Sequence, residues 1–267
     1  MISFVTCIKI LPSYSDIADR LQVYVDCVHQ GCSALGIIYE IIVVEDICSK
    51  NMKLLRSVVD ENWCKERNVR HIPYEATYAN PHGFPLIEAF AKNHGIRAAV
   101  YPYVCVTNCD LAFNRGFFEF LASPALRPQT FYRFLQYEIP APPVWRWSDV
   151  EPLLETPRFC FNGKLQQLGS CTLEHISYKS GDIMLLDAAI WSQVQGFPEN
   201  EVWVHSDFIV CQVVSNNGIP LSVPSNAFVY TYPQHRPEST NDVAKVYENK
   251  AAEYLTRTSC NFLNIKA

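Results

Sequence analysis

Asn108 and Asp110 follow the apolar segment 103–107 and are the leading candidates for chemistry in this 267-residue chain. The segment is short and rich in β-branched residues, which predicts a buried strand that ends close to a carboxylate. Side chains two residues apart in an extended segment point to the same side, so an amide and a carboxylate oxygen can together hold a divalent cation or a ribose hydroxyl. Ligands of α/β proteins bind at this end of the strands.

Two further aspartates fall at a predicted strand end or helix start. Asp46 follows the apolar segment 39–44, and Asp207 comes after His205 and Ser206 at the start of a predicted helix. In a doubly wound sheet such positions converge on one crevice, although they lie far apart in the sequence. The alternative for each aspartate is a turn or a cap, and the helix dipole by itself favours an acid at Asp207.

A histidine and several tryptophans complete the candidate set. His235 lies in the polar, turn-rich segment 232–237, where it can contact a ligand or a phosphate. The indole rings can stack on a sugar or fill the core, and they belong to Trp145, Trp147, Trp191 and Trp203.

The elements that must position these residues alternate between strand and helix. Strands are predicted at 2–9, 39–44, 69–74 and 103–107. Helices are predicted after a cap at Ser13 or Ser15, over 52–62, and from Pro85 to Gly95. This alternation indicates an α/β fold with a doubly wound, mostly parallel sheet flanked by helices.

The rhythm changes after residue 110. We expect strands at 131–137 and 183–186, a helix from Ser206 to Gly218 and an amphipathic helix over 240–257. The Pro-rich segment 138–157 between them is a candidate lid.

Composition limits the class of protein. With 49% hydrophobic residues the chain can bury one large core, so we expect a single domain over 1–267. The net charge is -5 and no basic run is present, which makes nucleic acid an improbable partner. No secretory leader is recognised, and the longest apolar stretch, 34–44, is too short to span a bilayer, so a cytoplasmic location is expected.

Eleven cysteines are expected to be mostly buried, reduced thiols, because several lie inside apolar segments. Cys105 and Cys109 flank the candidate site without a matching Cys-x-x-Cys pair, so zinc has little support.

These residues together resemble the nucleotide-sugar glycosyltransferases of the GT-A fold, in particular the inverting family 2-like enzymes. The resemblance covers about residues 2–218 and rests on the order of its blocks. These are the opening strand 2–9, the acidic end of 43–46, Asn108-Cys109-Asp110 in place of Asp-x-Asp, the segment 180–186, Trp191 with 196–199, and His205-Ser206-Asp207.

The resemblance implies a nucleoside diphosphate sugar donor, most simply a UDP- or GDP-sugar, and a glycan or glycoconjugate acceptor. It implies that residues 1–112 bind the donor, while 113–267 bind the acceptor and carry the terminal helix. Asp207 would be the catalytic base of an inverting displacement. Mn²⁺ or Mg²⁺ would be held by Asp110 with His235. The donor contacts would be Thr6, Asp46, Asn108, Asp110 and Asp182, and the acceptor contacts Trp203, Glu199 and Trp145.

Two departures from the family pattern matter. Asn108 stands where the family has its first aspartate, which removes one negative ligand and predicts weaker metal binding. His205-Ser206-Asp207 replaces the commoner Glu-Asp pair at the base.

Two other functions are weighed against transfer. A sugar nucleotidyltransferase would carry a Gly-rich, basic loop after the first strand, whereas residues 7–12 contain no glycine. A catalytically degenerate domain that binds a nucleotide sugar or a glycan would share the fold without turnover, and the missing first acid motivates that alternative.

Overall fold

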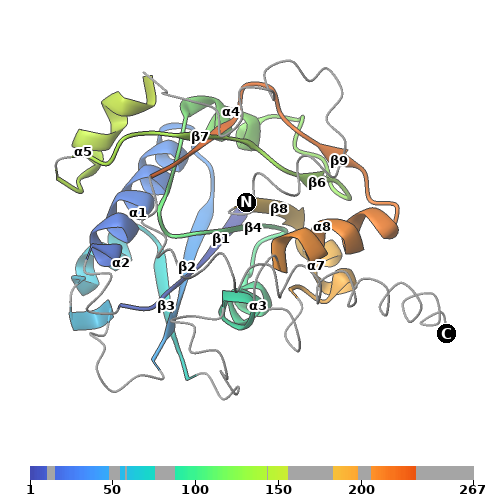
Figure 1. Cartoon of the computed structure of the whole chain (residues 1–267), viewed down its shortest axis with the longest axis horizontal. Helices are drawn as coiled ribbons and strands as arrows, with labels where there is room; N and C mark the ends of the chain where they lie inside the picture. The colour runs from blue at the N-terminus through green and yellow to red at the C-terminus, as the bar shows by residue number, and fades with distance from the viewer. Residues whose placement is uncertain are drawn as a thin grey trace, which may run out of the picture.

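The computed structural model describes residues 1–10, 16–47, 55–57, 59–75, 88–142, 144–155, 183–197 and 206–232. Two sheets are present in these residues (Figure 1). The larger has seven strands in the order β3-β2-β1-β4-β8-β6-β9, and the smaller has three in the order β5-β10-β7.

The strands of the larger sheet are β1 (Ile2–Ile8), β2 (Tyr39–Asp46), β3 (Val69–Tyr74), β4 (Tyr103–Thr107), β6 (Phe131–Tyr132), β8 (Ile183–Asp187) and β9 (Leu221–Ser222). Those of the smaller sheet are β5 (Leu111–Phe113), β7 (Leu135–Glu138) and β10 (Phe228–Thr231). The helices are α1 (Ile17–Ala34), α2 (Glu61–Glu66), α3 (Glu88–Ala98), α4 (Arg115–Ala122), α5 (Trp147–Val150), α7 (Ala188–Val194) and α8 (Ser206–Asn216), with 3₁₀ turns η2 (Leu55–Ser57) and η3 (Glu151–Glu155).

The larger sheet is mostly parallel, as predicted. β1 pairs in parallel with β2 and β4, and β2 pairs in parallel with β3. β8 is antiparallel to both β4 and β6, while β9 returns to a parallel pairing with β6. The α/β class and the doubly wound arrangement are therefore confirmed.

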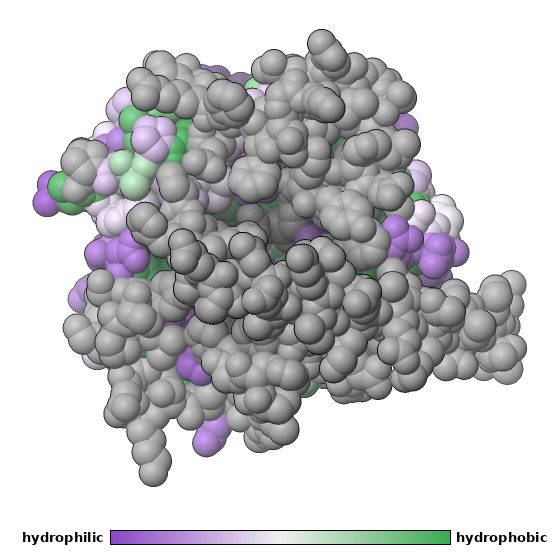
Figure 2. Space-filling view, viewed as in Figure 1, coloured by the Kyte–Doolittle hydropathy of each residue, from purple (hydrophilic) through white to green (hydrophobic). Residues whose placement is uncertain are grey.

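Helices cover both faces of the sheet because its strands are apolar on both sides. Ile2, Phe4 and Ile8 of β1 pack in one hydrophobic cluster with residues of α1 and α4, whereas Val5 and Cys7 pack in a second cluster with residues of α3, α7 and α8. Figure 1 shows α1 and α2 on one side of β1, β2 and β3, and α3, α7 and α8 on the other. In the same view, Figure 2 shows hydrophilic residues around the position of α2 and hydrophobic residues near α5.

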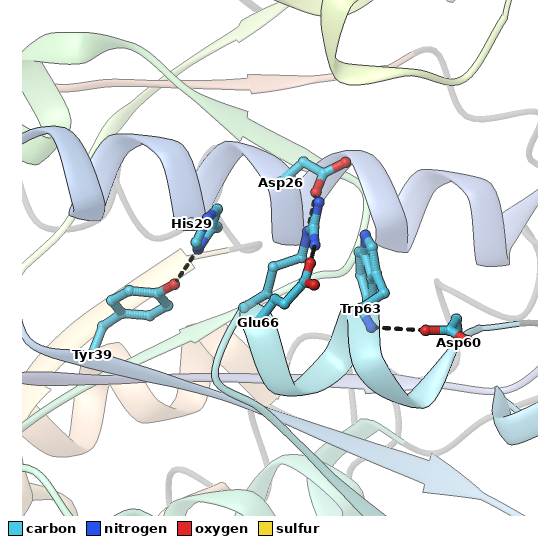
Figure 3. A network of polar contacts seen from close by, with 7 residues as sticks. Asp26, His29, Tyr39, Asp60, Trp63 and Glu66 are labelled. Carbon is cyan, nitrogen blue, oxygen red and sulfur yellow. Dashed lines mark hydrogen bonds and ion pairs between the residues drawn. The ribbon is translucent and has the colours of Figure 1, made fainter.

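An ion pair joins the end of helix α2 to α1 (Figure 3). Arg67 follows α2, and its Nε donates to Asp26 Oδ1 of α1 at 2.5 Å. The same guanidinium lies 4.9 Å from the ring centre of Trp63. Asp60 caps α2, because its carboxylate accepts from the Trp63 backbone N–H at 3.0 Å. The predicted helix 52–62 is thus shifted, since the described part shows η2 and then α2.

The predicted strand 131–137 was wrong as a single strand. It divides into β6, which pairs with β8 and β9, and β7, which pairs with β10 in the other sheet. The segment 131–137 is apolar at most positions, with Arg133 and Gln136 between them, and this local pattern does not mark the change of sheet.

Two helix boundaries also differ from the prediction. α3 continues through Gly95 to Ala98. Gly95 does not end the helix but lets it pack closely against β1, since a Cβ there would lie 2.4 Å from Val5 Cγ1. α1 begins after Asp16, whose side chain forms no cap hydrogen bond and instead pairs with Arg20. Ser13, Ser15, Pro85 and the predicted helix 240–257 lie outside the described residues.

Within the described part of the chain, the cysteines are free thiols and no helix is long and apolar enough to cross a membrane.

Candidate functional site

The parallel strands β1, β2 and β4 end at the same edge of the larger sheet. Ile8 of β1 is opposite Glu45 of β2, so Lys9 and Asp46 are the next residues on these two strands. β4 ends at Thr107, directly before Asn108. The antiparallel strand β8 begins at this edge, because Ile183 is opposite Thr107. The sheet therefore brings Asp46 and the Asn108 to Asp110 turn to one edge, as the sequence predicted.

Asp46 forms a buried ion pair with Lys9. Lys9 Nζ lies 3.1 Å from Asp46 Oδ2, and their side chains are 8% and 1% exposed. A carboxylate removed from water needs a partner of opposite charge, and the lysine supplies it. The predicted nucleoside contact of Asp46 would have to form beside this ammonium.

Asn108 is held by a lysine from α3. Lys92 Nζ donates to Asn108 Oδ1 at 2.7 Å and to Glu88 Oε2 at 2.6 Å. The Lys92 side chain is 6% exposed and the Glu88 side chain 47%, so the ammonium is covered while its carboxylate partner reaches solvent. A positive charge thus occupies the place next to the residue that replaces the first aspartate of the family motif.

Asp110 lies beside an arginine from α1. Arg20 Nη1 is 3.8 Å from Asp110 Oδ2, and Arg20 also pairs with Asp16 at 2.8 Å. The guanidinium stacks over Trp145 at 4.5 Å from the ring centre, and Trp145 contacts Tyr232 edge-on at 4.6 Å. The structure therefore links Trp145, a predicted acceptor contact, to Asp110 through Arg20.

Thr6 lies inside the sheet, fully buried. Its hydroxyl has no hydrogen-bond partner among the residues that the structure describes. On the neighbouring strand the Thr107 hydroxyl is 2.7 Å from the Tyr24 hydroxyl. A nucleoside contact by Thr6 remains a prediction.

The thiol of Cys7 is surrounded by the charged groups of this edge. Burial raises its pKa strongly, Glu88 raises it further, and Lys92 lowers it. Burial likewise raises the pKa of Cys109, next to Asp110. Both thiols are therefore protonated at neutral pH.

Asp207 lies in the first turn of α8 and is half-buried. The Cys211 thiol lies one turn later in the same helix, and its pKa is raised to about 11, mainly by burial. The nearby Arg133 guanidinium lowers this pKa, whereas Asp207 raises it. Arg133 directly follows β6 and is fully buried, with its guanidinium 5.8 Å from the ring centre of Phe131. The candidate base thus lies in a region that also holds a buried positive charge.

Four predicted site residues lie outside the described part of the chain: Asp182, Glu199, Trp203 and His235. The candidate lid 138–157 lies partly outside it as well.

Carboxylate and amide oxygens are ligands that suit a hard divalent cation, but few of them are available at this edge among the described residues. Asp110 offers a carboxylate, whereas the amide oxygen of Asn108 accepts from the Lys92 ammonium. No group of three His, Cys, Asp or Glu residues in the described ranges could hold a metal. Of Asn108 and Asp110, only Asp110 offers a carboxylate to a cation, and Arg20 lies beside it.

Several charged residues of the site were missed by the sequence analysis, namely Lys9, Arg20, Lys92 and Arg133. The available signals were weak. Glu88 and Lys92 have helical spacing i,i+4, and Lys9 directly follows the first strand.

The fold matches solved structures of TarS from S. aureus. A structure of TarS 1–349 in complex with UDP-GlcNAc aligns with a TM-score of 0.59 and 16% identity, covering 90% of this chain and 61% of that one. A complex of the same TarS fragment with UDP aligns with a TM-score of 0.56 and 15% identity, covering 88% of this chain and 61% of the fragment. A structure of TarS itself aligns with a TM-score of 0.56 and 16% identity, covering 87% of this chain and 36% of TarS.

These matches confirm that the chain has the GT-A fold expected from the resemblance. The chain spans about 61% of the TarS fragment and 36% of TarS. No family model matches the sequence, and no curated protein matches it either.

Proposed function

We propose that this chain is a glycosyltransferase that moves a sugar from a nucleoside diphosphate sugar to an acceptor hydroxyl. The observation that carries the proposal is that Asp46, Asn108 and Asp110 lie at the same edge of the sheet, where β1, β2 and β4 end. A GT-A protein of the same fold binds UDP and UDP-GlcNAc, so a UDP-sugar is the first donor to test.

In this proposal the edge of the sheet holds the donor. Asp46 contacts the nucleoside, and the diphosphate lies by the turn from Asn108 to Asp110. Lys92 and Arg20 place fixed positive charge beside these two residues, which favours an anion there. Mn²⁺ or Mg²⁺, held by Asp110 with His235, would supply further positive charge for the departing diphosphate.

Asp207 acts as the base in the same proposal. A sugar hydroxyl is a weak nucleophile at neutral pH, so a carboxylate within hydrogen-bond reach that accepts its proton lowers the barrier. The hydroxyl oxygen forms the new bond to the anomeric carbon while the bond to the diphosphate breaks, with inversion. Trp145, Trp203 and Glu199 are the proposed acceptor contacts, and Asp182 binds a hydroxyl of the donor sugar.

Nucleotide binding tests the proposal directly. Calorimetry with UDP, GDP, CDP and dTDP, each with and without Mn²⁺, is expected to show binding of UDP that Mn²⁺ strengthens. Asp110→Asn is expected to remove the effect of Mn²⁺. Glu61→Gln is the matched control, because it removes one acidic charge from a side chain that is 85% exposed in α2. Absence of binding by all four nucleotides in the wild type would refute the proposal.

A domain that binds a nucleotide sugar without turnover is the second candidate. The replacement of the first acid by Asn108, together with its bond to Lys92, favours this candidate because it leaves less room for a metal. The measurement is release of UDP from UDP-GlcNAc. Release that is lost in Asp207→Asn while UDP still binds favours the enzyme, whereas binding without release favours the binding domain.

A further inference from the structure

Neighbouring residues of α3 contact two segments that are far apart in the sequence. Lys92 reaches the donor turn through Asn108 Oδ1, at 2.7 Å. Asn93 instead reaches the turn after α7. Its Nδ2 donates to the Phe197 carbonyl at 2.8 Å, and its Oδ1 accepts from the Phe197 N–H at 2.7 Å. Successive helical side chains point about 100° apart, so one helix can serve both segments.

The paired hydrogen bonds between Asn93 and the Phe197 backbone form what we call the Asn93 clamp. A carboxamide offers a donor and an acceptor side by side, which matches the N–H and C=O of one residue. Both residues are nearly inaccessible, with Asn93 2% and Phe197 4% exposed. Water cannot readily replace these bonds, so breaking them leaves buried polar groups without partners.

The turn is shaped to accept the Asn93 side chain. Gly196 has φ +74°, and a Cβ on it would lie 2.2 Å from Asn93 Oδ1. The Phe197 ring stacks on Trp191 with ring centres 5.6 Å apart, and the Trp191 indole N–H donates to the Val104 carbonyl of β4. The start of the connection toward α8 is therefore fixed against both α3 and the central strand.

We propose that Asn93 is a positioning residue: the clamp holds the turn after α7 at Phe197, from which the chain continues to the Asp207 helix, against the donor-binding edge of the sheet. This inference rests on the proposed function. Lys92 and Asn93 belong to one helix, so the donor turn and the backbone of Phe197 are held by the same element. A change in the clamp should alter the placement of the acceptor and the base while leaving the nucleotide site intact.

Two glycines allow a matched test of this inference. Gly196→Ala adds a methyl group against Asn93 at a positive φ. Gly218→Ala adds the same methyl group at φ +71°, where no atom lies within 4 Å. The two substitutions carry similar backbone strain, so their difference isolates the contact with Asn93. Asn93→Ala removes the clamp itself, and Asn93→Asp keeps the acceptor for the Phe197 N–H but loses the donor.

The first readout compares turnover with nucleotide affinity, using UDP release from UDP-GlcNAc and calorimetry with UDP. Asn93→Ala and Gly196→Ala are expected to lower turnover by about 10- to 100-fold, the range expected when reacting groups are misplaced by roughly 1 Å. UDP affinity should stay within about twofold of wild type, because the donor turn is held by Lys92. Asn93→Asp should lose at least as much turnover as Asn93→Ala, because it turns a buried carboxylate oxygen toward the Phe197 carbonyl. Gly218→Ala should retain wild-type turnover.

The second readout is amide hydrogen exchange of peptides that include Phe197. Exchange should be faster in Asn93→Ala and Gly196→Ala than in wild type, and unchanged in Gly218→Ala. Wild-type turnover in Asn93→Ala, a parallel loss of UDP affinity, or an equal loss in Gly218→Ala would overturn the inference.

Failure of the proposed function is recognised separately. A wild-type chain that binds none of UDP, GDP, CDP and dTDP would refute the function. Hydrogen exchange then decides the inference, which is overturned if exchange at Phe197 is the same in Asn93→Ala and wild type.

Discussion

The buried ion pair between Lys9 and Asp46 makes a strong prediction about stability. Lys9→Met keeps a side chain of similar length and removes the ammonium that lies 3.1 Å from the carboxylate. Asp46 is 1% exposed, so its charge cannot regain water without local rearrangement. The variant therefore leaves a buried carboxylate that has lost this partner.

The magnitude follows from distance and burial. At 3.1 Å and an effective dielectric constant of about 20, the attraction between unit charges is about 5 kcal/mol. The cost of removing Asp46 from water persists in the variant, so we expect the free energy of unfolding to fall by about 3–5 kcal/mol. Replacing both residues, as in Lys9→Met with Asp46→Leu, should recover about 2 kcal/mol of that loss because neither charge then remains buried.

Urea unfolding of both single variants and the double variant measures these terms. Lys65→Met is the matched control, because Lys65 also lies 3.1 Å from its partner, Glu61, but the side chains are 69% and 85% exposed. The control should change stability by less than about 1 kcal/mol. Similar losses in Lys9→Met and Lys65→Met, or additive effects in the cycle at Lys9 and Asp46, would refute the reasoning that burial makes the pair strong.

Three further predictions concern other parts of the site and the core. Lys92→Met should weaken UDP binding about tenfold, or about 1.4 kcal/mol, because it removes fixed positive charge beside Asn108; calorimetry that finds equal affinity would contradict this. Glu45→Ala should destabilise the protein by about 3 kcal/mol in thermal or urea unfolding, since the buried carboxylate accepts from Leu55 N–H and lies 2.8 Å from His71 Nε2, whereas Glu45→Gln should lose less. Burial raises the pKa of the Cys7 thiol, and those of other core thiols, above the ordinary value of 9.0, so stability is retained below pH 9 and lost above it as the unfolded thiols ionise. The loss is up to about 1.4 kcal/mol per pH unit for each thiol, and equal urea midpoints at pH 8 and pH 10 under reducing conditions would contradict it.

The elements that carry the candidate site followed closely from sequence periodicity. The strand predicted at 103–107 has those bounds in the structure, and the strand at 69–74 does too. A short apolar segment is a local signal of a buried strand, so it can be recognised without knowing which strands lie beside it. The segment 131–137 shows the limit, because β6 and β7 lie close together in the sequence but pair in different sheets.

The acidic residues of the site were also accessible to sequence reasoning, whereas their partners were not. Asp46 and Asp110 could be placed at strand ends because strand ends in a parallel sheet share one edge. Arg20 was not assigned to the site, since a charged residue on a helix is usually a solvated one. Only the packing of α1 against the smaller sheet puts its guanidinium 3.8 Å from Asp110.

The sequence by itself thus determined the α/β class, the alternation of elements and the edge at which Asp46, Asn108 and Asp110 gather. These features depend on burial patterns within single segments and on the shared direction of parallel strands. Tertiary structure alone decided which groups meet: Lys92 with Asn108, across 16 residues, and Asn93 with Phe197, across 104. Such contacts depend on strand order and on how closely each helix packs against the sheet, and no local pattern in the chain records either.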